Sequence, residues 1–338
     1  MKKWQGHQKG VNFGGWFSQC FPDEKHYDSF ITEPDFDTVS NKWGCDHVRV
    51  PVDYILVEDN DGTPKEAGMR RIERCAELCA KYGLNMILDL HTAFGYSFAS
   101  DGGFFKDEAL QKRFYDLWER FAERFSDRSD MLAFELLNEI TDPSYAAVWR
   151  DISLRCIERI RAHAPDTVIL IGGHSYNSAV AVPELPAPPD ENIVYNFHNY
   201  DPKVFTHQGA GWMPELASVR TPYLSDMAEM LEFSERIYPG ITAEYRGIKT
   251  KTCGAEMYME LFAAAAEYAE KNGVPLYCGE YGVIDRATPE DTLKWYREIH
   301  KAFQALSIGR AAWSYRRMDF GLSDERMSGV IDELVQYL

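Results

Sequence analysis

The chain has 338 residues, of which 45% are hydrophobic, so it can bury a large core as one or two domains. Its 53 Asp and Glu residues outnumber its 36 Lys and Arg residues and give a net charge of -17. Because this charge repels phosphate groups, we expect no nucleic-acid partner and no anionic membrane surface as a partner.

The seven cysteines are scattered along the chain without the spacing of a zinc site or of a compact disulfide framework. They are Cys20, Cys45, Cys75, Cys79, Cys156, Cys253 and Cys278. This pattern predicts reduced, mostly buried thiols. Lys2 and Lys3 precede no apolar run of signal-peptide length, and no later stretch approaches about 18 apolar residues. We therefore expect a cytoplasmic protein, or an extracellular one if another export route is used or a signal was removed.

Eight short segments rich in β-branched and aromatic residues are typical of strands, and several are apolar on both faces, as buried parallel strands are. They cover residues 9-15, 47-52, 85-91, 131-139, 167-173, 193-200, 275-282 and 309-315. Helical periodicity lies between them, for example from Met69 to Cys79 and from Leu110 to Phe125. Thr32 and Thr288 each stand three residues before an acid, which predicts helix starts.

Strands that alternate with helices in this way predict a (β/α)8 TIM barrel, whose chemistry lies at the C-terminal ends of the strands. The sixth and seventh predicted strands start 82 residues apart, at residues 193 and 275, while the other intervals are much shorter. We therefore expect one catalytic domain over residues 1-338, with an inserted lobe at 201-253 after strand six. The lobe is expected to shape one wall of the cleft; the alternative is a stabilising addition away from substrate.

Polar side chains gather at the predicted strand ends. They are two carboxylates, two histidines, an arginine, an asparagine, a tyrosine and a tryptophan: Glu139, Glu280, His91, His198, Arg49, Asn138, Tyr200 and Trp313. A glutamate in an apolar strand is costly unless it is paired or functional. Strands four and seven lie across the mouth of such a barrel, so Glu139 and Glu280 can face each other. One acid and one carboxylate are what glycoside hydrolysis requires, with a separation that decides between retention and inversion.

The chain resembles glycoside hydrolase family 5, and is most similar to its compact CelC-type endoglucanases. The similarity runs nearly end to end, through GVNFGGW, HVRVPVDY, LDLHTAFGY, AFELLNE, IVYNFHNYDP, LYCGEYGV and AAWSYRRMDF. All eight positions that the family shares at its active site are present. FTHQGAGW is similar to the opening of the family's subdomain after strand six.

The resemblance implies a role for each of these residues. Glu139 is expected to be the general acid/base and Glu280 the nucleophile, kept ionised by Arg49 and Tyr200. Asn138 would bind the sugar 2-hydroxyl, His91 other hydroxyls, Trp313 would form the floor, and His198 would lie beside the acid/base. From the residues themselves, Trp16 and Trp212 are candidates for outer stacking platforms, with core packing as the alternative.

We expect a retaining endo-β-1,4-glucanase that also cuts mixed-linkage β-1,3-1,4-glucans, with a β-glucan polysaccharide or oligosaccharide as substrate. No metal or cofactor and a monomeric state are expected. The alternatives on the same scaffold are an exo-β-1,3-glucanase and a β-mannanase. From other classes, the alternatives are a non-catalytic carbohydrate-binding barrel and a metal-dependent hydrolase that uses His91 and His198.

Overall fold

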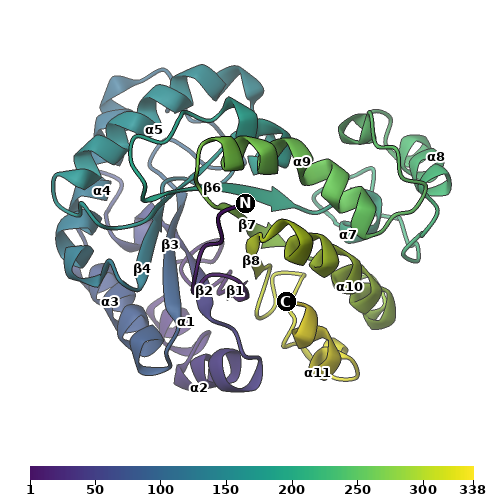
Figure 1. Cartoon of the computed structure of the whole chain (residues 1–338). Helices are drawn as coiled ribbons and strands as arrows, with labels where there is room; N and C mark the ends of the chain where they lie inside the picture. The colour runs from purple at the N-terminus through teal and green to yellow at the C-terminus, as the bar shows by residue number, and fades with distance from the viewer.

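A computed structural model describes residues 1–338, and its centre is a closed barrel of eight parallel strands in the order of the chain (Figure 1). The strands are β1 Gly10–Asn12, β2 His47–Asp53, β3 Asn85–Thr92, β4 Leu132–Glu135, β5 Ile169–Gly172, β6 Ile193–Asn199, β7 Leu276–Tyr281 and β8 Gly309–Ala312. The predicted (β/α)8 fold is therefore confirmed.

Helices connect successive strands and surround the barrel (Figure 1). They are α1 Glu24–Ser29, α2 Glu33–Asp37, α3 Glu66–Lys81, α4 Glu108–Phe125, α5 Ala146–Arg161, α6 His174–Asn177, α7 Lys203–Thr206, α8 Met227–Ile237, α9 Ala255–Lys271, α10 Pro289–Leu306 and α11 Ile331–Leu334. Thr32 and Thr288 are the N-cap residues of α2 and α10, as expected. No helix combines the length and apolar character that crossing a bilayer requires.

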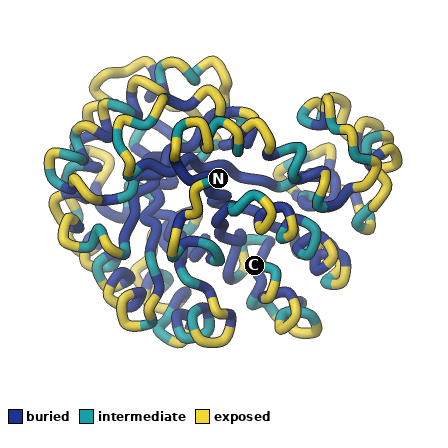
Figure 2. Tube along the Cα trace, in the orientation of Figure 1, coloured by how far each residue is buried: buried dark blue, intermediate teal, exposed yellow.

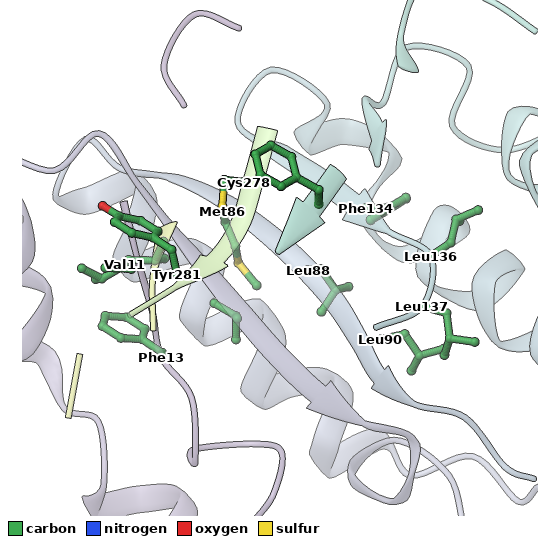
Figure 3. Packing of buried hydrophobic residues seen from close by; sticks show 14 of the residues in the cluster. Val11, Phe13, Met86, Leu88, Leu90, Phe134, Leu136, Leu137, Cys278 and Tyr281 are labelled. Carbon is green, nitrogen blue, oxygen red and sulfur yellow. The ribbon is translucent and has the colours of Figure 1, made fainter. Parts of the chain in front are cut away.

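Two layers of apolar side chains hold the barrel together. The larger one lies between the strands and the surrounding helices, and Figure 3 shows part of it, including Phe134, Leu136 and Tyr281. The helices are buried where they face the strands and exposed on the outside (Figure 2). All seven cysteines are free thiols, and all except Cys20 are buried, as the sequence predicts.

A second, smaller apolar layer fills the interior of the barrel. It consists of Trp4, Ile87, Ala133, Leu170, Val194, Tyr277 and Ala311. Because side chains alternate along a strand, every second residue after this layer also points inward, nearer the mouth. Beyond Ile87 and Ala133 these are Asp89 and Glu135, both fully buried. The strand periodicity thus places a polar layer directly above an apolar one, and this polar layer supports the site.

Three strands end three or four residues earlier than the sequence predicts. β1 ends at Asn12, not at residue 15. β4 ends at Glu135, not at residue 139, and Asn138 lies beyond it, with its backbone N–H donated to the carbonyl of Leu90 at 3.1 Å. β8 ends at Ala312, and Trp313 follows it. At each of these ends the backbone leaves the hydrogen-bonded ladder at the rim of the barrel while the sequence stays apolar. A run of apolar residues therefore overestimates the strand length.

Residues 201–253 lie between β6 and α9 and contain α7, α8 and the 3-10 helix η6, Ala243–Tyr245. Figure 1 shows α8 standing away from the barrel, beyond the end of β6. Within the segment, the hydroxyl of Tyr245 donates a buried hydrogen bond of 2.7 Å to Oδ1 of Asp201, which lies two residues after the end of β6. The inserted segment is therefore anchored close to the strand ends.

Candidate active site

The buried guanidinium of Arg49 organises the bottom of the site. Its Nε and Nη2 donate to the two carboxylate oxygens of Glu135 at 2.7 and 2.8 Å. Nη1 donates to Glu280 at 2.8 Å, and Nη2 also lies 3.0 Å from a carboxylate oxygen of Asp89. All of these side chains are buried. A guanidinium only donates hydrogen bonds and offers five of them in a fixed plane, so it fixes the position of each acceptor around it.

Glu280 points into the barrel because the pairing of β7 is irregular. The register of β7 against β8 shifts between Cys278 and Tyr281, and that of β6 against β7 shifts between Phe197 and His198. Such irregularities re-aim side chains at the rims of barrels. Glu280 accepts one hydrogen bond from Arg49 at 2.8 Å.

The second oxygen of Glu280 accepts a hydrogen bond from the hydroxyl of Tyr200 at 2.8 Å. Burial, followed by the charge of Glu280, raises the pKa of Tyr200 well above its usual value, so the phenol keeps its proton and donates. Two donors, one of them positively charged, therefore stabilise the negative charge on Glu280.

Glu139 lies opposite, beyond the end of β4, on strained backbone. Its φ of 42° is in the left-handed region that residues other than glycine rarely adopt, and the hydroxyl of Tyr96 donates to its carbonyl at 2.7 Å. Nδ1 of His198 lies 2.9 Å from Oε1 of Glu139. Burial raises the pKa of Glu139 to about 7, against the opposing charges of His91 and Arg49. Near neutral pH this carboxyl can therefore hold a proton and release it.

One donor atom each from Glu139, His198 and Glu280 lie within 4.8 Å of one another. These three side chains are the group here that could hold a metal ion. The guanidinium of Arg49, 2.8 Å from Glu280, opposes a cation at this place. Burial lowers the pKa of His198 to about 4, so its imidazole is neutral near pH 7. The geometry suits two carboxylates that act on one bond between them.

His91 and Trp313 lie side by side at another part of the mouth. Their ring planes are 5° apart and their centroids 5.8 Å apart. Nδ1 of His91 lies 2.7 Å from Asp89, while its buried Nε2 has no partner. Gly14 is required here, because a Cβ on it would come within 2.7 Å of the indole of Trp313. The free Nε2 is therefore available to a ligand above the site.

Asn138 is oriented by Arg49, whose Nη2 donates to its Oδ1 at 2.9 Å. Because the guanidinium cannot accept a hydrogen bond, the amide oxygen must face it and the NH2 group must face away. All eight strand-end residues expected from the sequence thus lie together at the mouth of the barrel, with Asn138 presenting a donor beside the two glutamates.

The two outer tryptophans differ. Trp212, in the inserted segment, is 55% exposed, with its ring edge-on to His207. Trp16 is only 6% exposed, stacks on Phe17 at 3.9 Å and donates its indole N–H to the carbonyl of Tyr27. The expectation that Trp16 is an outer platform is wrong, because both its ring and its N–H are used within the core.

Five further residues hold the site and were not predicted from the sequence. They are Asn12, Asp89, Tyr96, Glu135 and Asn196, and each makes a hydrogen bond to a site residue or to a residue that orients one. Asp89 and Glu135 could have been found, since each is a lone acid inside an apolar strand segment, LDLH and AFELL. Burial raises the pKa of Asp89 to about 7.

An eight-stranded (β/α)8 barrel with two facing carboxylates at its mouth is an arrangement that glycoside hydrolases use. The family model described as Cellulase (glycosyl hydrolase family 5) matches residues 5–319. The chain belongs to glycoside hydrolase family 5, the cellulase family.

Two curated relatives cover almost the whole chain. Cellodextrinase A of Ruminococcus flavefaciens is 43% identical over 314 residues, which are 92% of this chain and 86% of that protein. Endoglucanase C of Acetivibrio thermocellus is 39% identical over 338 residues, 97% of each chain. Among solved structures, endoglucanase Cel5A from Thermotoga maritima superposes with a TM-score of 0.77 at 23% identity, covering 98% of this chain and 97% of that one. This last likeness concerns the fold.

Proposed function

We propose that the protein is a retaining endo-β-1,4-glucanase that also hydrolyses mixed-linkage β-1,3-1,4-glucan. The observation that carries the retaining mechanism is the separation of Glu139 and Glu280, of which one carboxylate oxygen each lie within 4.8 Å. Retaining enzymes hold the two carboxyl groups about 5 Å apart, whereas inverting enzymes need roughly 6.5 to 9.5 Å to admit a water. Two carboxylate oxygens this close support the shorter spacing that retaining enzymes use.

In the first step Glu280 attacks the anomeric carbon and forms an ester to the sugar. At the same time the bond from that carbon to the glycosidic oxygen breaks, and Glu139 gives its proton to the departing oxygen. In the second step Glu139, now ionised, takes a proton from water, whose oxygen attacks the anomeric carbon and releases Glu280. Two inversions give net retention.

The surrounding residues have separate parts in this scheme. Arg49 and Tyr200 stabilise the carboxylate of Glu280 before attack and again when it leaves. The NH2 group of Asn138 faces away from Arg49 and donates to the sugar 2-hydroxyl, a contact that strengthens in the transition state. Nε2 of His91 binds a further hydroxyl, and Trp313 forms the floor beneath the cleaved sugar.

The choice of substrate is supported by the relatives. The names Cellodextrinase A and Endoglucanase C refer to β-1,4-glucan oligosaccharides and to internal cleavage, respectively. The exposed indole of Trp212 offers a stacking surface to a sugar outside the cleavage point. Seven free thiols favour a reducing compartment, in which soluble oligosaccharides are the substrates. Cell fractionation that finds the protein outside the cell would contradict that location.

The function is tested on a panel of carboxymethylcellulose, barley β-glucan, laminarin, mannan and cellopentaose. We expect new reducing ends from the first two and from cellopentaose, with a rapid fall in the viscosity of the polymers, which marks internal cleavage. Glucose released from laminarin without loss of viscosity would instead identify an exo-β-1,3-glucanase, and cleavage of mannan alone a mannanase. Binding without any product would identify a carbohydrate-binding barrel. Activity that a chelator abolishes would identify a metal-dependent hydrolase.

A further inference from the structure

A lysine and a glutamate from the segment 201–253 face each other beside Glu139. Nζ of Lys203, the first residue of α7, lies 3.5 Å from Oε1 of Glu244 in η6. The hydroxyl of Ser178 donates to the other oxygen of Glu244 at 3.3 Å. Ser178 in turn pairs with His198 through a β-bridge, and His198 contacts Glu139. The pair therefore adjoins the candidate acid/base on the side of β5 and β6.

Glu139 and Ser178 follow β4 and β5, across the mouth from Trp313, whereas Lys203 follows β6, which only β7 separates from β8. The closed strand order places β8 and β1 across the barrel from β4 and β5. Trp313 follows β8 and contacts Gly14 after β1, whereas Ser178 and Lys203 follow β5 and β6. A sugar chain that is cut between Glu139 and Glu280 has its cleaved sugar over Trp313. Its leaving group then extends past Glu139, toward the lysine and the glutamate.

The hydrogen-bonding capacity of the pair is largely unused. An ammonium has three donors and a carboxylate about four acceptor sites, but their mutual contact and the contact to Ser178 are both long. The side chains of Lys203 and Glu244 are 35% and 28% exposed. A structural ion pair in the same protein looks different, since Arg161 makes two hydrogen bonds of 2.7 and 3.0 Å to Asp190. Free donors and acceptors beside a cleavage point suit sugar hydroxyls.

Both side chains are held in place by one buried anchor. Tyr245, adjacent to Glu244, donates its hydroxyl to the carboxylate of Asp201, two residues before Lys203. The carbonyl of Asp201 accepts further hydrogen bonds from the hydroxyl of Tyr258 at 3.1 Å and from the indole of Trp295 at 2.8 Å. The inserted segment and the barrel rim are thereby fixed to each other where the pair forms.

We propose that Lys203 and Glu244 bind the first sugar of the leaving group, whose oxygen Glu139 protonates, through hydrogen bonds to its hydroxyls. This inference rests on the proposed glucanase function and gives the inserted segment a part in specificity. The same place binds an acceptor sugar in the second step. An acceptor hydroxyl then attacks the anomeric carbon in place of water, Glu139 takes its proton, and the ester to Glu280 breaks, which yields a longer oligosaccharide.

The test compares two substrates that differ only in the leaving group. Cellotetraose places sugars on the leaving-group side, whereas β-cellobiosyl fluoride places none there and needs no proton from Glu139. For Lys203→Met and Glu244→Gln we expect the ratio of kcat/KM on cellotetraose to kcat/KM on the fluoride to fall about 10- to 100-fold, as for a lost hydrogen bond to a charged group. Tyr245→Phe, which removes the anchor hydroxyl, should lower it about 3- to 10-fold.

Lys112→Met is the matched control, since Lys112 forms an exposed ion pair with Asp116 on α4, and its ratio should equal that of the wild type. An unchanged ratio would overturn the inference, either because both substrates lose activity equally, which indicates a general structural effect, or because neither loses any. A wild-type enzyme that cuts another oligosaccharide but not cellotetraose would refute the proposed substrate alone. The same ratio measured with that oligosaccharide and its glycosyl fluoride would then decide the role of the pair.

Discussion

Nη1 of Arg49 lies 2.8 Å from Oε1 of Glu280, and both side chains are almost completely removed from solvent. The same guanidinium also holds Glu135 and lies 3.0 Å from Asp89. One cation thus contacts three buried carboxyl groups. In the interior an ionised carboxylate without a partner loses its hydration and gains nothing in return, so the site depends on this one arginine for both its charge balance and its shape.

Replacement of Arg49 by Met should therefore unfold the protein more easily. We expect the free energy of unfolding to fall by about 3–5 kcal/mol, the cost of leaving buried charges unpaired. Guanidinium denaturation followed by circular dichroism measures this. Arg124→Met is the control, because Arg124 pairs with Glu66 and Glu73 at the surface, where solvent screens the charges, and its loss should change stability far less. Similar effects for the two variants would refute this view of Arg49.

Removal of the carboxyl group at position 139 should slow the cleavage of each substrate to a degree that depends on its leaving group. We expect Glu139→Ala to reduce kcat/KM on cellotetraose by about 10² to 10⁴-fold, the usual contribution of general acid catalysis. On β-cellobiosyl fluoride the first step should be much less affected, and added azide should intercept the ester and yield β-cellobiosyl azide. Product analysis by mass spectrometry and NMR checks this. An equal loss on both substrates would show that Glu139 does not protonate the leaving group.

The pH dependence should show a limb that belongs to Glu139. Since burial raises its pKa to about 7, the fraction of protonated acid falls as pH rises through 7. We expect kcat/KM on cellotetraose to decrease above about pH 7, approaching tenfold per pH unit, while the fluoride shows no such limb. Profiles from pH 5 to 9 measure this. A limb of the same pKa with both substrates would assign it to another group.

The same raised pKa predicts a change in stability with pH. The folded state holds a proton on Glu139 up to about pH 7, whereas the unfolded chain loses it near the ordinary glutamate pKa of 4.5. Between these values the folded state binds more protons, so its stability falls as pH rises. Glu139→Gln removes this loss, and its stability relative to the wild type should increase by about 2 kcal/mol from pH 5 to pH 8. Denaturation curves at both pH values test this, and a constant difference would contradict it.

The sequence was sufficient to predict the barrel and the eight residues around its mouth. Apolar segments such as 85-91 and 193-200 form strands because both of their faces are covered, and polar residues at their ends must then meet at the mouth. Glu139 and Glu280 could be recognised because an acid beside an apolar strand demands a partner or a function.

The remaining features depend on contacts between distant segments, which a linear pattern does not record. The direction of Glu280 depends on the register shift in β7, and the place of Glu139 depends on the early end of β4. Trp16 is a core residue because its ring stacks on Phe17 and its N–H donates to the carbonyl of Tyr27, and its position in the sequence does not reveal these contacts. The contact of Glu244 with Lys203 joins positions 41 residues apart.

The most direct test of the central claim is proton NMR of the anomeric signals during the first minutes of cellopentaose hydrolysis, with Glu280→Gln run in parallel. Attack by Glu280 followed by attack of water predicts that the β-anomer of the new reducing end appears first and converts slowly to the α-anomer. The variant should release no product. Early α-anomer, or full activity of Glu280→Gln, would contradict the assignment of Glu280 as the nucleophile of a retaining glucanase.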